Sequence, residues 1–303
     1  MPKVLWTGRL SPEMRFMMNT SNLVAWATGS MRDTEAMKER MKQGYDGAFS
    51  AHVNHYDQEG LALHARCAVE QLKDVDVRGK SVLDIGGGTG ISSFVMLRRG
   101  AAHVTCGDIS EHMLAFAREK AEREGYGLER MDFRQLDAED LPYGDGSFDV
   151  VSMSMTMGFL PNQYRAMREM ARVVRPGGLV TIGTQAPDHY WEPIEATLRA
   201  SRKRYMFGYR LEFWPQTESE VRRLMERSGI VDIESRRVTW HKSFGSGGEV
   251  FDFFAAVSAS WWYGRFPPDR REEEAARTRA GFERLGTRTV TGDIIVASGK
   301  KPK

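Results

Sequence analysis

A glycine-rich segment at residues 84–90 contains the residue types with the clearest chemical potential. It reads DIGGGTG, so an acid at the end of an apolar run is followed by Gly86, Gly88 and Gly90. Glycine suits a position where the backbone must turn tightly and where any Cβ would collide with an approaching ligand. The segment therefore predicts a ligand-binding turn between a strand and a helix, although a purely structural turn can have the same composition.

The spacing of these glycines bears on the kind of ligand. A turn that binds a nicotinamide dinucleotide has the pattern G-x-G-x-x-G, with a third glycine three residues after the second. Here Gly86 and Gly88 are followed by Ile91 at that third position. The spacing therefore disfavours a dehydrogenase.

Two acids further along the chain extend the same expected site. Asp108 lies about 20 residues beyond the glycine turn, the spacing at which an acid meets ribose hydroxyls in a mononucleotide-binding fold. Asp137 follows another β-rich run, and its carboxylate could accept a hydrogen bond from an adenine amino group. A solvated turn or a helix cap is the alternative role for Asp108. A solvated acidic loop is the alternative for Asp137, because Glu139 and Asp140 follow it.

The elements that must position these residues alternate in type along the chain. Between residues 81 and 183, short β-rich runs alternate with amphipathic stretches, which predicts βαβ units and a parallel sheet. Ser110 is expected to cap the helix after the second strand, and Gly100 and Gly125 are expected to end the first two helices. The expected strands span residues 81–85, 103–108, 131–136, 148–155 and 179–184, with Pro-Gly-Gly at 176–178 separating the fifth from a helix.

The segments on either side of this core, residues 81–185, are less regular. Residues 1–80 are polar and weakly helical in pattern, and we expect an N-terminal helical lid there. Five of the chain's seven tryptophans follow residue 185, which indicates an aromatic cap interleaved with the last strands at 186–303. In that region we expect a helix at 218–228, strands at 230–238 and 289–298, and an inserted pair of helices within 251–282.

Taken together, these stretches resemble the class I S-adenosylmethionine-dependent methyltransferases, especially the small-molecule branch that includes the ubiquinone and menaquinone C-methyltransferases. Two further family landmarks are matched by residues 147–151, which read SFDVV, and residues 172–178, which read RVVRPGG. The resemblance covers residues 82–184 well, reaches the helix before Gly229, and fades in the lid and the cap. It implies a Rossmann-like α/β fold with a seven-stranded, mostly parallel sheet and helices on both faces. It also implies S-adenosyl-L-methionine as the cofactor, with S-adenosyl-L-homocysteine as its product.

The resemblance implies roles for individual residues at the cofactor. The glycines of the turn would pass under its methionine part, and the acid before them would orient its amino group. Asp108 would bind the ribose, and Asp137 with the backbone of Ala138 would hold the adenine. The full set of expected cofactor-binding residues is Tyr45 in the lid, Asp84, Gly86, Gly88, Gly90, Asp108, Ile109, Asp137, Ala138 and Met153.

The end of the expected fourth strand departs from the family pattern. In many relatives a histidine or another polar residue faces the acceptor there, whereas residues 155–160 read MTMGFL. A methionine stripe is usually flexible core filling. The alternative is that Met157 and Phe159 line an apolar acceptor pocket. In either case no ready-made base stands at this position.

Polar and aromatic residues follow two later strands, at the edge of the sheet where ligands of open α/β folds bind. Tyr190 and Trp191 come after the fifth expected strand, and Trp240 and His241 come after the sixth. We expect Tyr190 and His241 as candidate bases and Trp191 and Trp240 as acceptor contacts, although a packed or surface role is an alternative for each. The lid holds a further group of candidates, His52, His55 and Tyr56.

The composition disfavours several other classes of protein. The 303 residues carry a formal net charge of +2, too small to indicate a nucleic-acid or membrane footprint. Cys67 and Cys106 are the only cysteines, so we expect neither a disulfide framework nor a metal site. No apolar run approaches the roughly 18 residues of a membrane span, and no secretion signal is recognisable. We therefore expect a cytoplasmic protein with a small-molecule acceptor, and homo-oligomerisation stays open.

The sequence thus predicts an enzyme that transfers a methyl group in line to a small acceptor held under an aromatic cap. An oxygen or carbon acceptor would need a base, whereas a thioether or thiolate would not, so an S-methyltransferase is one alternative. A cofactor-binding protein without turnover is a second alternative. A nucleic-acid methyltransferase is disfavoured by the near-neutral charge balance.

Overall fold

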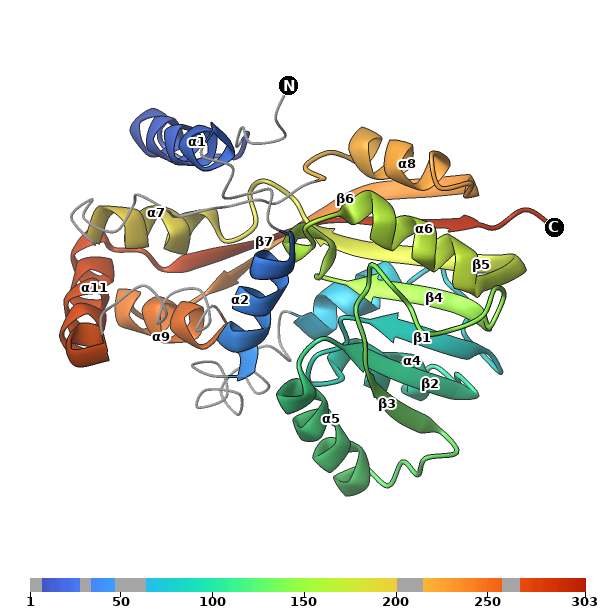
Figure 1. Cartoon of the computed structure of the whole chain (residues 1–303). Helices are drawn as coiled ribbons and strands as arrows, with labels where there is room; N and C mark the ends of the chain where they lie inside the picture. The colour runs from blue at the N-terminus through green and yellow to red at the C-terminus, as the bar shows by residue number, and fades with distance from the viewer. Residues whose placement is uncertain (1–6, 28–33, 47–63, 201–214, 258–267) are drawn as a thin grey trace. The chain divides into compact units, whose positions relative to one another are not determined.

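A computed structural model describes residues 7–27, 34–46, 64–200, 215–257 and 268–303. Its central feature is a seven-stranded sheet with the order β3-β2-β1-β4-β5-β7-β6 (Figure 1). The pairs from β3 across to β5 are parallel, and β7 is antiparallel to β5. The Rossmann-like, mostly parallel sheet expected from the sequence is therefore confirmed. The strands are β1 (Ser81–Ile85), β2 (His103–Asp108), β3 (Met131–Gln135), β4 (Phe148–Ser154), β5 (Val174–Gln185), β6 (Val231–Ser243) and β7 (Thr289–Lys300).

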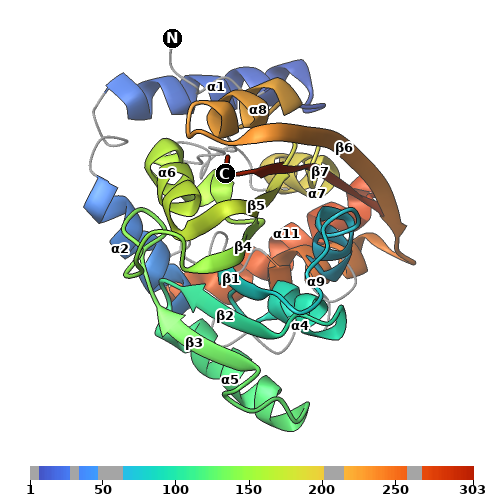
Figure 2. The same cartoon turned by 90° about the vertical axis from the view of Figure 1, so that its right-hand side faces the viewer.

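Helices cover both faces of the parallel part of the sheet (Figure 2). On one face α4 (Ile91–Arg98) contacts β2, and α5 (Glu111–Arg123) contacts β2 and β3. On the other face α6 (Gln163–Val173) contacts β4 and β5, and α8 (Glu218–Glu226) contacts α6. The residues of β1 after Ser81 are buried, as a central strand between two helical layers requires. Val82 of this strand belongs to a core cluster that also includes Phe94, Leu97, Val104, Leu114 and Val150.

Local signals at the helix ends are where the sequence predicts them. The Ser110 hydroxyl accepts a hydrogen bond from Met113 N and caps α5. Gly100 and Gly125 follow α4 and α5 with φ of 90° and 76°, in the left-handed region that favours glycine after a helix. Thr217 and Glu220 form a capping box at the start of α8. These helix boundaries are therefore set by short-range chemistry.

Two strand boundaries differ from the expected ones. Strand β5 begins at Val174, and the Pro-Gly-Gly segment lies within it as a bulge, because Val174 pairs with Phe148 and Leu179 already pairs with Val150. Strand β6 continues to Ser243, and its neighbour in the sheet is β7, which is 12 residues long. Trp240 and His241 therefore lie inside the sixth strand, and the expectation that they follow it is wrong.

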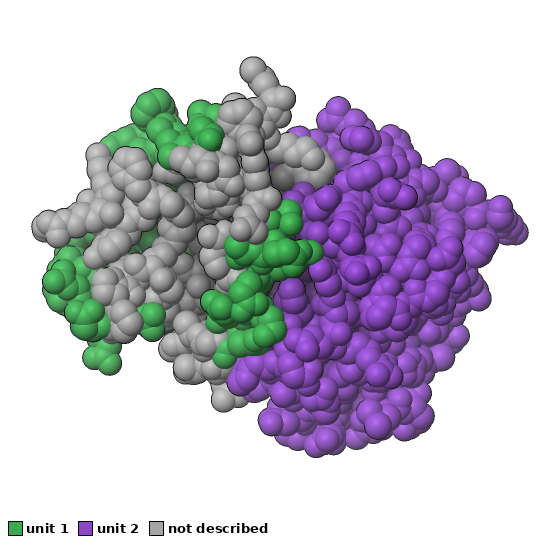
Figure 3. All heavy atoms as spheres, in the orientation of Figure 1, with its two compact units in different colours: residues 1–59, 186–214, 239–293 green, residues 60–185, 215–238, 294–303 purple. Residues whose placement is uncertain are grey.

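The chain divides into two compact units, shown in different colours in Figure 3. Unit 2 comprises residues 60–185, 215–238 and 294–303 and holds the parallel part of the sheet with its helices. Unit 1 comprises residues 1–59, 186–214 and 239–293. The α-helices described in it are α1 (Pro12–Ala27), α2 (Thr34–Asp46), α7 (Trp191–Ala200), α9 (Gly247–Val257) and α11 (Arg271–Leu285).

Unit 1 has its own aromatic packing. Helix α11 contacts both α7 and α9, and the rings of Phe251 and Phe282 meet edge to face with centroids 5.5 Å apart. The inserted pair of helices expected within 251–282 corresponds to α9 and α11, with α9 starting earlier, at Gly247. Covering roles for the expected lid and cap stay predictions. Several expected residues lie outside the described ranges: His52, His55, Tyr56, Trp214, Trp261 and Trp262.

No helix among the residues that the structure describes is long and apolar enough to cross a membrane.

Candidate active site

The glycine turn after β1 has the backbone geometry that its sequence predicts. Gly86, Gly88 and Gly90 have φ of 70°, 54° and 82°, all in the region that favours glycine. The N–H groups of Gly86 and Gly87 both donate to the carbonyl of Gly107, at 2.7 and 3.0 Å. The turn is therefore fastened to the end of the neighbouring strand β2.

The individual glycines of this turn are needed for different reasons. A Cβ on Gly86 would lie 2.2 Å from Thr156 Oγ1, and one on Gly90 would lie 2.7 Å from the Phe94 ring. A Cβ on Gly87 would lie 2.5 Å from Cys106 Sγ. On Gly88, by contrast, a Cβ would meet nothing closer than a Met113 methyl group at 3.4 Å. Gly88 is thus the point of the turn with open space beside its backbone, where a ligand can approach.

Asp84 is fully buried at the end of β1. Its Oδ2 accepts hydrogen bonds from the hydroxyls of Ser92 and Ser93, each at 2.6 Å, at the start of α4. Oδ1 has no hydrogen-bond partner of good geometry among the described residues. Burial raises the pKa of this carboxyl to about 6, while the hydroxyls of Ser92, Ser93 and Ser152 favour its charged form. The carboxylate thus braces the first turn of α4, and one of its oxygens keeps bonding capacity for a cationic group.

Asp108, at the end of β2, is joined directly to the glycine turn. Its Oδ2 accepts a hydrogen bond from Gly88 N at 2.9 Å, and its Oδ1 accepts one from Ser110 N at 2.9 Å. The next residue, Ile109, is half-buried, and its carbonyl accepts a hydrogen bond from Gln135 Nε2 at 2.9 Å. The tertiary structure therefore brings together two predicted site residues, Gly88 and Asp108, that are 20 positions apart in the chain.

The acidic segment after β3 forms a closed turn. Asp137 Oδ1 accepts a hydrogen bond from Glu139 N at 2.9 Å, and its carbonyl accepts one from Asp140 N at 3.1 Å. Ala138 is buried inside this turn. Glu139, which was not expected to be functional, is also buried, and its Oε1 accepts a hydrogen bond from Asn162 N at 2.7 Å. The acids at 137 and 139 are thus structural elements of an ordered loop, and contact of Asp137 and Ala138 with adenine stays a prediction.

The segment after β4 is packed more tightly than its methionines suggest. Met153 and Met157 are both fully buried, and Phe159 ends the short 3-10 helix η2 (Met157–Phe159) with partial exposure. Met155 has a φ of 58°, which is uncommon for a residue with a side chain, and its N–H donates to Gly183 O at 2.6 Å. Met157 therefore serves as core filling in the described structure, and its contact with an acceptor stays a prediction.

Thr156 is the polar residue at this strand end that sequence reasoning missed. Its hydroxyl lies 3.2 Å from Gly86 O and 3.0 Å from Ser154 O, and either carbonyl can accept its proton. Its hydroxyl is thereby tied to the glycine turn. The signal that could have found it is the glycine itself, because Gly86 leaves the space that the Thr156 side chain fills.

Four of the residues expected on the acceptor side, Tyr190, Trp191, Trp240 and His241, belong to unit 1, whereas Met157 and Phe159 belong to unit 2. Tyr190 is buried, with a φ of 58°, and its ring meets those of Phe253 and Phe254 edge to face. Trp240 is buried against Gly292, where a Cβ would lie 2.3 Å from the indole ring. Both are therefore packed into unit 1, whereas His241, the next residue on β6, is exposed.

Trp191 and Tyr45 differ in their surroundings. Trp191 begins α7 and lines a pocket of about 490 Å³, a volume typical of small-molecule sites. The other residues that line it are Arg9, Ser11, Glu192, Glu195, Ala196, Arg199, Leu285, Thr287, Arg288 and Thr289. Tyr45 lies near the end of α2 and is half-buried, and its contact with a cofactor stays a prediction.

A buried carboxylate, Asp293, organises the polar groups of unit 1. Its Oδ2 accepts a hydrogen bond from Asp188 N at 3.0 Å, and its Oδ1 accepts one from the Thr239 hydroxyl at 3.0 Å. Its backbone N–H donates to His189 Nδ1 at 3.1 Å, which places His189 beside β7. Sequence reasoning missed this cluster, because its members come from three segments far apart in the chain.

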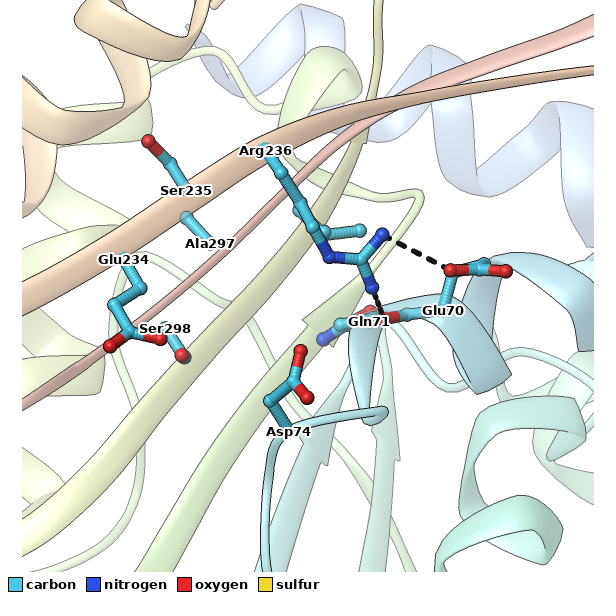
Figure 4. Close-up of a pocket in the computed structure, with 9 residues that line it drawn as sticks. Glu70, Gln71, Asp74, Glu234, Ser235, Arg236, Ala297 and Ser298 are labelled. Carbon is cyan, nitrogen blue, oxygen red and sulfur yellow. Dashed lines mark hydrogen bonds and ion pairs between the residues drawn. The ribbon is translucent and has the colours of Figure 1, made fainter.

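A smaller pocket of about 140 Å³ lies in unit 2 between the helix at residues 64–71 and strands β6 and β7 (Figure 4). The Arg236 guanidinium crosses it and bonds Glu70 twice, through Oε2 at 3.1 Å and the backbone carbonyl at 2.6 Å. The remaining acids at its rim, Asp74 and Glu234, are exposed. Arg236 therefore ties the helix to the sheet, and we assign the pocket a structural role. Within the described ranges, no group of three histidine, cysteine, aspartate or glutamate side chains could hold a metal ion.

Comparisons with known proteins agree with the geometry of the turn. The model of a family described as "Methyltransferase domain" matches residues 83–182. The ubiquinone/menaquinone biosynthesis C-methyltransferase UbiE of Idiomarina loihiensis is 36% identical over 220 residues, which cover 72% of each chain. An uncharacterized protein of Mycobacterium tuberculosis is 33% identical over 178 residues, which cover 58% of this chain and 63% of that protein. The chain thus spans less than two thirds of the length of some curated relatives that it matches.

Solved structures support the same fold. The YcgJ protein of Bacillus subtilis superposes with a TM-score of 0.55 and 18% identity, over 79% of this chain and 100% of that one. The open backbone at Gly88, the bond from Gly88 to Asp108 and the bonding capacity of Asp84 all fit the methionine and ribose parts of S-adenosylmethionine. On the sequence match to UbiE, the fold and this site, the chain belongs to the class I S-adenosylmethionine-dependent methyltransferases.

Proposed function

We propose that this protein transfers a methyl group from S-adenosylmethionine to a small-molecule acceptor. The observation that carries the proposal is the contact between Gly88 and Asp108, which joins an open glycine backbone to an acid at the end of the neighbouring strand. The ribose hydroxyls of a nucleoside can donate hydrogen bonds to the carboxylate of such an acid. The φ of 54° at Gly88 accounts for glycine at this position, although no protein atom crowds it.

The chain's own residues would divide the work of binding. Asp108 would hold the ribose hydroxyls, and the turn at Asp137 and Ala138 would hold the adenine. Asp84 would act on the amino group through its electric charge while it braces α4. When bound, S-adenosylmethionine supplies a methyl group on a positively charged sulfur, which keeps the bonding electron pair as the methyl leaves in line with the incoming nucleophile.

The acceptor class is proposed from the relatives. The relative from Idiomarina loihiensis is named as a C-methyltransferase, and a carbon that gains a methyl group must lose a proton. Tyr190 and His241 are the candidate bases of this chain. His241 is the better one, because it is exposed whereas Tyr190 is buried among phenylalanine rings. The pocket beside Trp191, whose lining is mostly charged and polar, is the proposed place for a polar part of the acceptor.

A labelling experiment tests this proposal. The protein is incubated with a metabolite extract and methyl-labelled S-adenosylmethionine, and labelled products are separated and identified by mass spectrometry. We expect label in a small molecule, and we expect none with Asp108→Ala. Cofactor binding by calorimetry without any labelled product would instead support a binding protein without turnover. Label in added nucleic acid would contradict the small-molecule acceptor.

A further inference from the structure

Three residues from different parts of unit 1 form a continuous hydrogen-bonded chain. His241 on β6 places its Nδ1 3.1 Å from the hydroxyl oxygen of Thr291 on β7. The same hydroxyl donates a short hydrogen bond to Glu192 Oε1, in the first turn of α7. Glu192 Oε2 accepts the backbone N–H of Thr291 at 2.9 Å. Glu192 therefore holds Thr291 by both its side chain and its backbone.

The chemistry of these groups determines which one donates each hydrogen bond. An ionised carboxylate only accepts hydrogen bonds, and a threonine hydroxyl has one proton to donate. With that proton directed at Glu192, the Thr291 oxygen offers His241 a lone pair, so the imidazole must donate from Nδ1. Thr291 is 2% exposed, so water has little access to compete for the hydroxyl. We infer that Glu192 and Thr291 are positioning residues that hold His241 as the Nδ1–H tautomer and leave its Nε2 as the proton acceptor.

This inference rests on the proposed function and deepens it, because it states how the candidate base would be prepared. His241 is exposed, so Nε2 can be reached by an acceptor, while the bond at Nδ1 fixes the plane of the ring. As the acceptor's bond to hydrogen breaks, the proton goes to Nε2 and the electron pair stays on the acceptor. The imidazolium that forms then faces the Thr291 oxygen, and through it the negative charge of Glu192. Such an arrangement orients and stabilises a base in the way that a carboxylate does behind a catalytic histidine.

The tautomer can be measured directly on the full chain, without turnover. The protein is labelled with ¹⁵N-histidine, and long-range ¹H–¹⁵N correlation spectra are recorded at about pH 8.5, above the range where histidine ordinarily titrates. The His241 signals are identified as those missing in His241→Gln. We expect the wild-type pattern of an Nδ1–H tautomer. An Nε2–H tautomer in the wild type would overturn the inference.

Variants test each link. In Glu192→Met the Thr291 hydroxyl loses its acceptor and can donate to His241 Nδ1, so we expect the tautomer to switch to Nε2–H. Thr291→Val should release the ring into a mixture of both tautomers, and Thr291→Ser should restore the wild-type pattern because the hydroxyl is kept. An unchanged tautomer in Glu192→Met would overturn the inference.

A matched control distinguishes loss of the His241–Thr291–Glu192 hydrogen bonds from a general disturbance of unit 1. Thr239 lies two residues before His241 on β6, and its hydroxyl donates a hydrogen bond to Asp293 Oδ1. This is a threonine–carboxylate bond that does not involve His241, Thr291 or Glu192. Thr239→Val should leave the His241 tautomer unchanged, and a switch there would overturn the assignment to Glu192 and Thr291. Calorimetry with S-adenosylhomocysteine is run on every variant, because retained binding shows a folded protein. An unexpected tautomer in a variant that still binds S-adenosylhomocysteine would contradict only this inference. Absence of a labelled product would contradict the proposed function instead.

Discussion

Two fully buried aspartates, Asp84 in unit 2 and Asp293 in unit 1, are satisfied in contrasting ways. The serine hydroxyls that bond Asp84 lie 8 and 9 positions along the chain, on the helix that follows its strand. The groups that bond the Asp293 carboxylate lie 54 and 105 positions away. The Asp84 carboxylate is therefore satisfied by neighbours in sequence, and the Asp293 carboxylate by segments that meet only in the folded chain.

This contrast predicts that substitutions in the two units will have separable effects. A change in the turn of unit 2 should act on cofactor affinity, because backbone atoms of the turn are proposed to meet the ligand. A change in the polar groups of unit 1 should act on the second substrate or on stability, and cofactor affinity should stay nearly constant. Measuring the affinity for S-adenosylhomocysteine therefore tests whether the effects of substitutions in the two units are separable.

The largest effect on affinity is expected for Gly88→Val. Its side chain would occupy the open space beside the turn, and overpacking of this kind costs about 1–3 kcal/mol, which corresponds to a loss of up to about 100-fold in affinity. Gly79→Val is the matched control, because Gly79 has a φ of 65° and nothing within 4 Å of an added Cβ. Calorimetry should show weak binding for Gly88→Val alone, although both variants should lose similar stability through backbone strain. Equal binding by the two would mean that the turn does not meet the cofactor.

Asp108→Ala comes next in size. It removes the carboxylate that accepts from Gly88 N and is proposed to bind ribose. A hydrogen bond to a charged group contributes about 1.5–3 kcal/mol, so affinity should fall at least about tenfold. The thermal midpoint without ligand should show that the fold survives. Unchanged affinity in the folded variant would remove Asp108 from the site.

The pH dependence of cofactor binding tests the proposed contact between Asp84 and the amino group of the cofactor. Burial raises the pKa of Asp84 to about 6, and a nearby ammonium group of the ligand should lower it again. Binding near pH 6 should therefore release up to about half a proton, and affinity should rise by at most about tenfold between about pH 5 and 7. Calorimetry in buffers of different ionisation enthalpy measures this release, which Asp84→Asn should abolish. No release in the wild type would leave Asp84 with its bracing role alone.

The same shift has a consequence for stability, with a definite sign. A carboxyl whose folded pKa lies above its ordinary value of 3.8 favours the folded state when it is protonated. That contribution is complete below about pH 4 and is lost as the pH rises through 6. Relative to wild type, Asp84→Asn should therefore gain up to about 3 kcal/mol in free energy of unfolding between those limits. Denaturant titrations without cofactor at the two ends of this range would reveal it, and a constant difference would contradict the burial effect.

The smallest effect on affinity is expected for unit 1. Tyr190→Phe and His241→Ala should bind S-adenosylhomocysteine within about threefold of wild type, because their proposed contacts are to the acceptor. A required base should contribute about 10²- to 10⁴-fold to turnover, and its removal should eliminate the acidic limb of the rate profile. An acceptor with no proton to lose, such as a thioether, would show no such limb in the wild type. Full activity of both variants would place the base elsewhere.

The sequence predicted the geometry of the glycine turn and the ends of the neighbouring helices closely, for a physical reason. The left-handed φ of Gly88, the Ser110 cap and the glycines that end two helices depend on interactions within a few residues, which residue type alone can indicate. The alternation of β-rich runs with amphipathic stretches indicated a parallel sheet, whose strand ends meet at one edge. That reasoning could not foresee that Thr156 occupies the space left by Gly86, because the two residues are 70 positions apart.

The acceptor side shows where such reasoning stops. Trp240 and His241 were expected after a strand, yet β6 extends through them because β7 lies beside it. The sequence by itself determined the cofactor turn, its acids and the alternation of strands and helices, since these follow from local backbone preferences and short-range spacing. Only the tertiary structure decided that Thr291 would stand between His241, 50 positions away, and Glu192, 99 positions away. Hydrogen bonds between such distant segments depend on how the whole chain packs, and no local pattern of residue types specifies them.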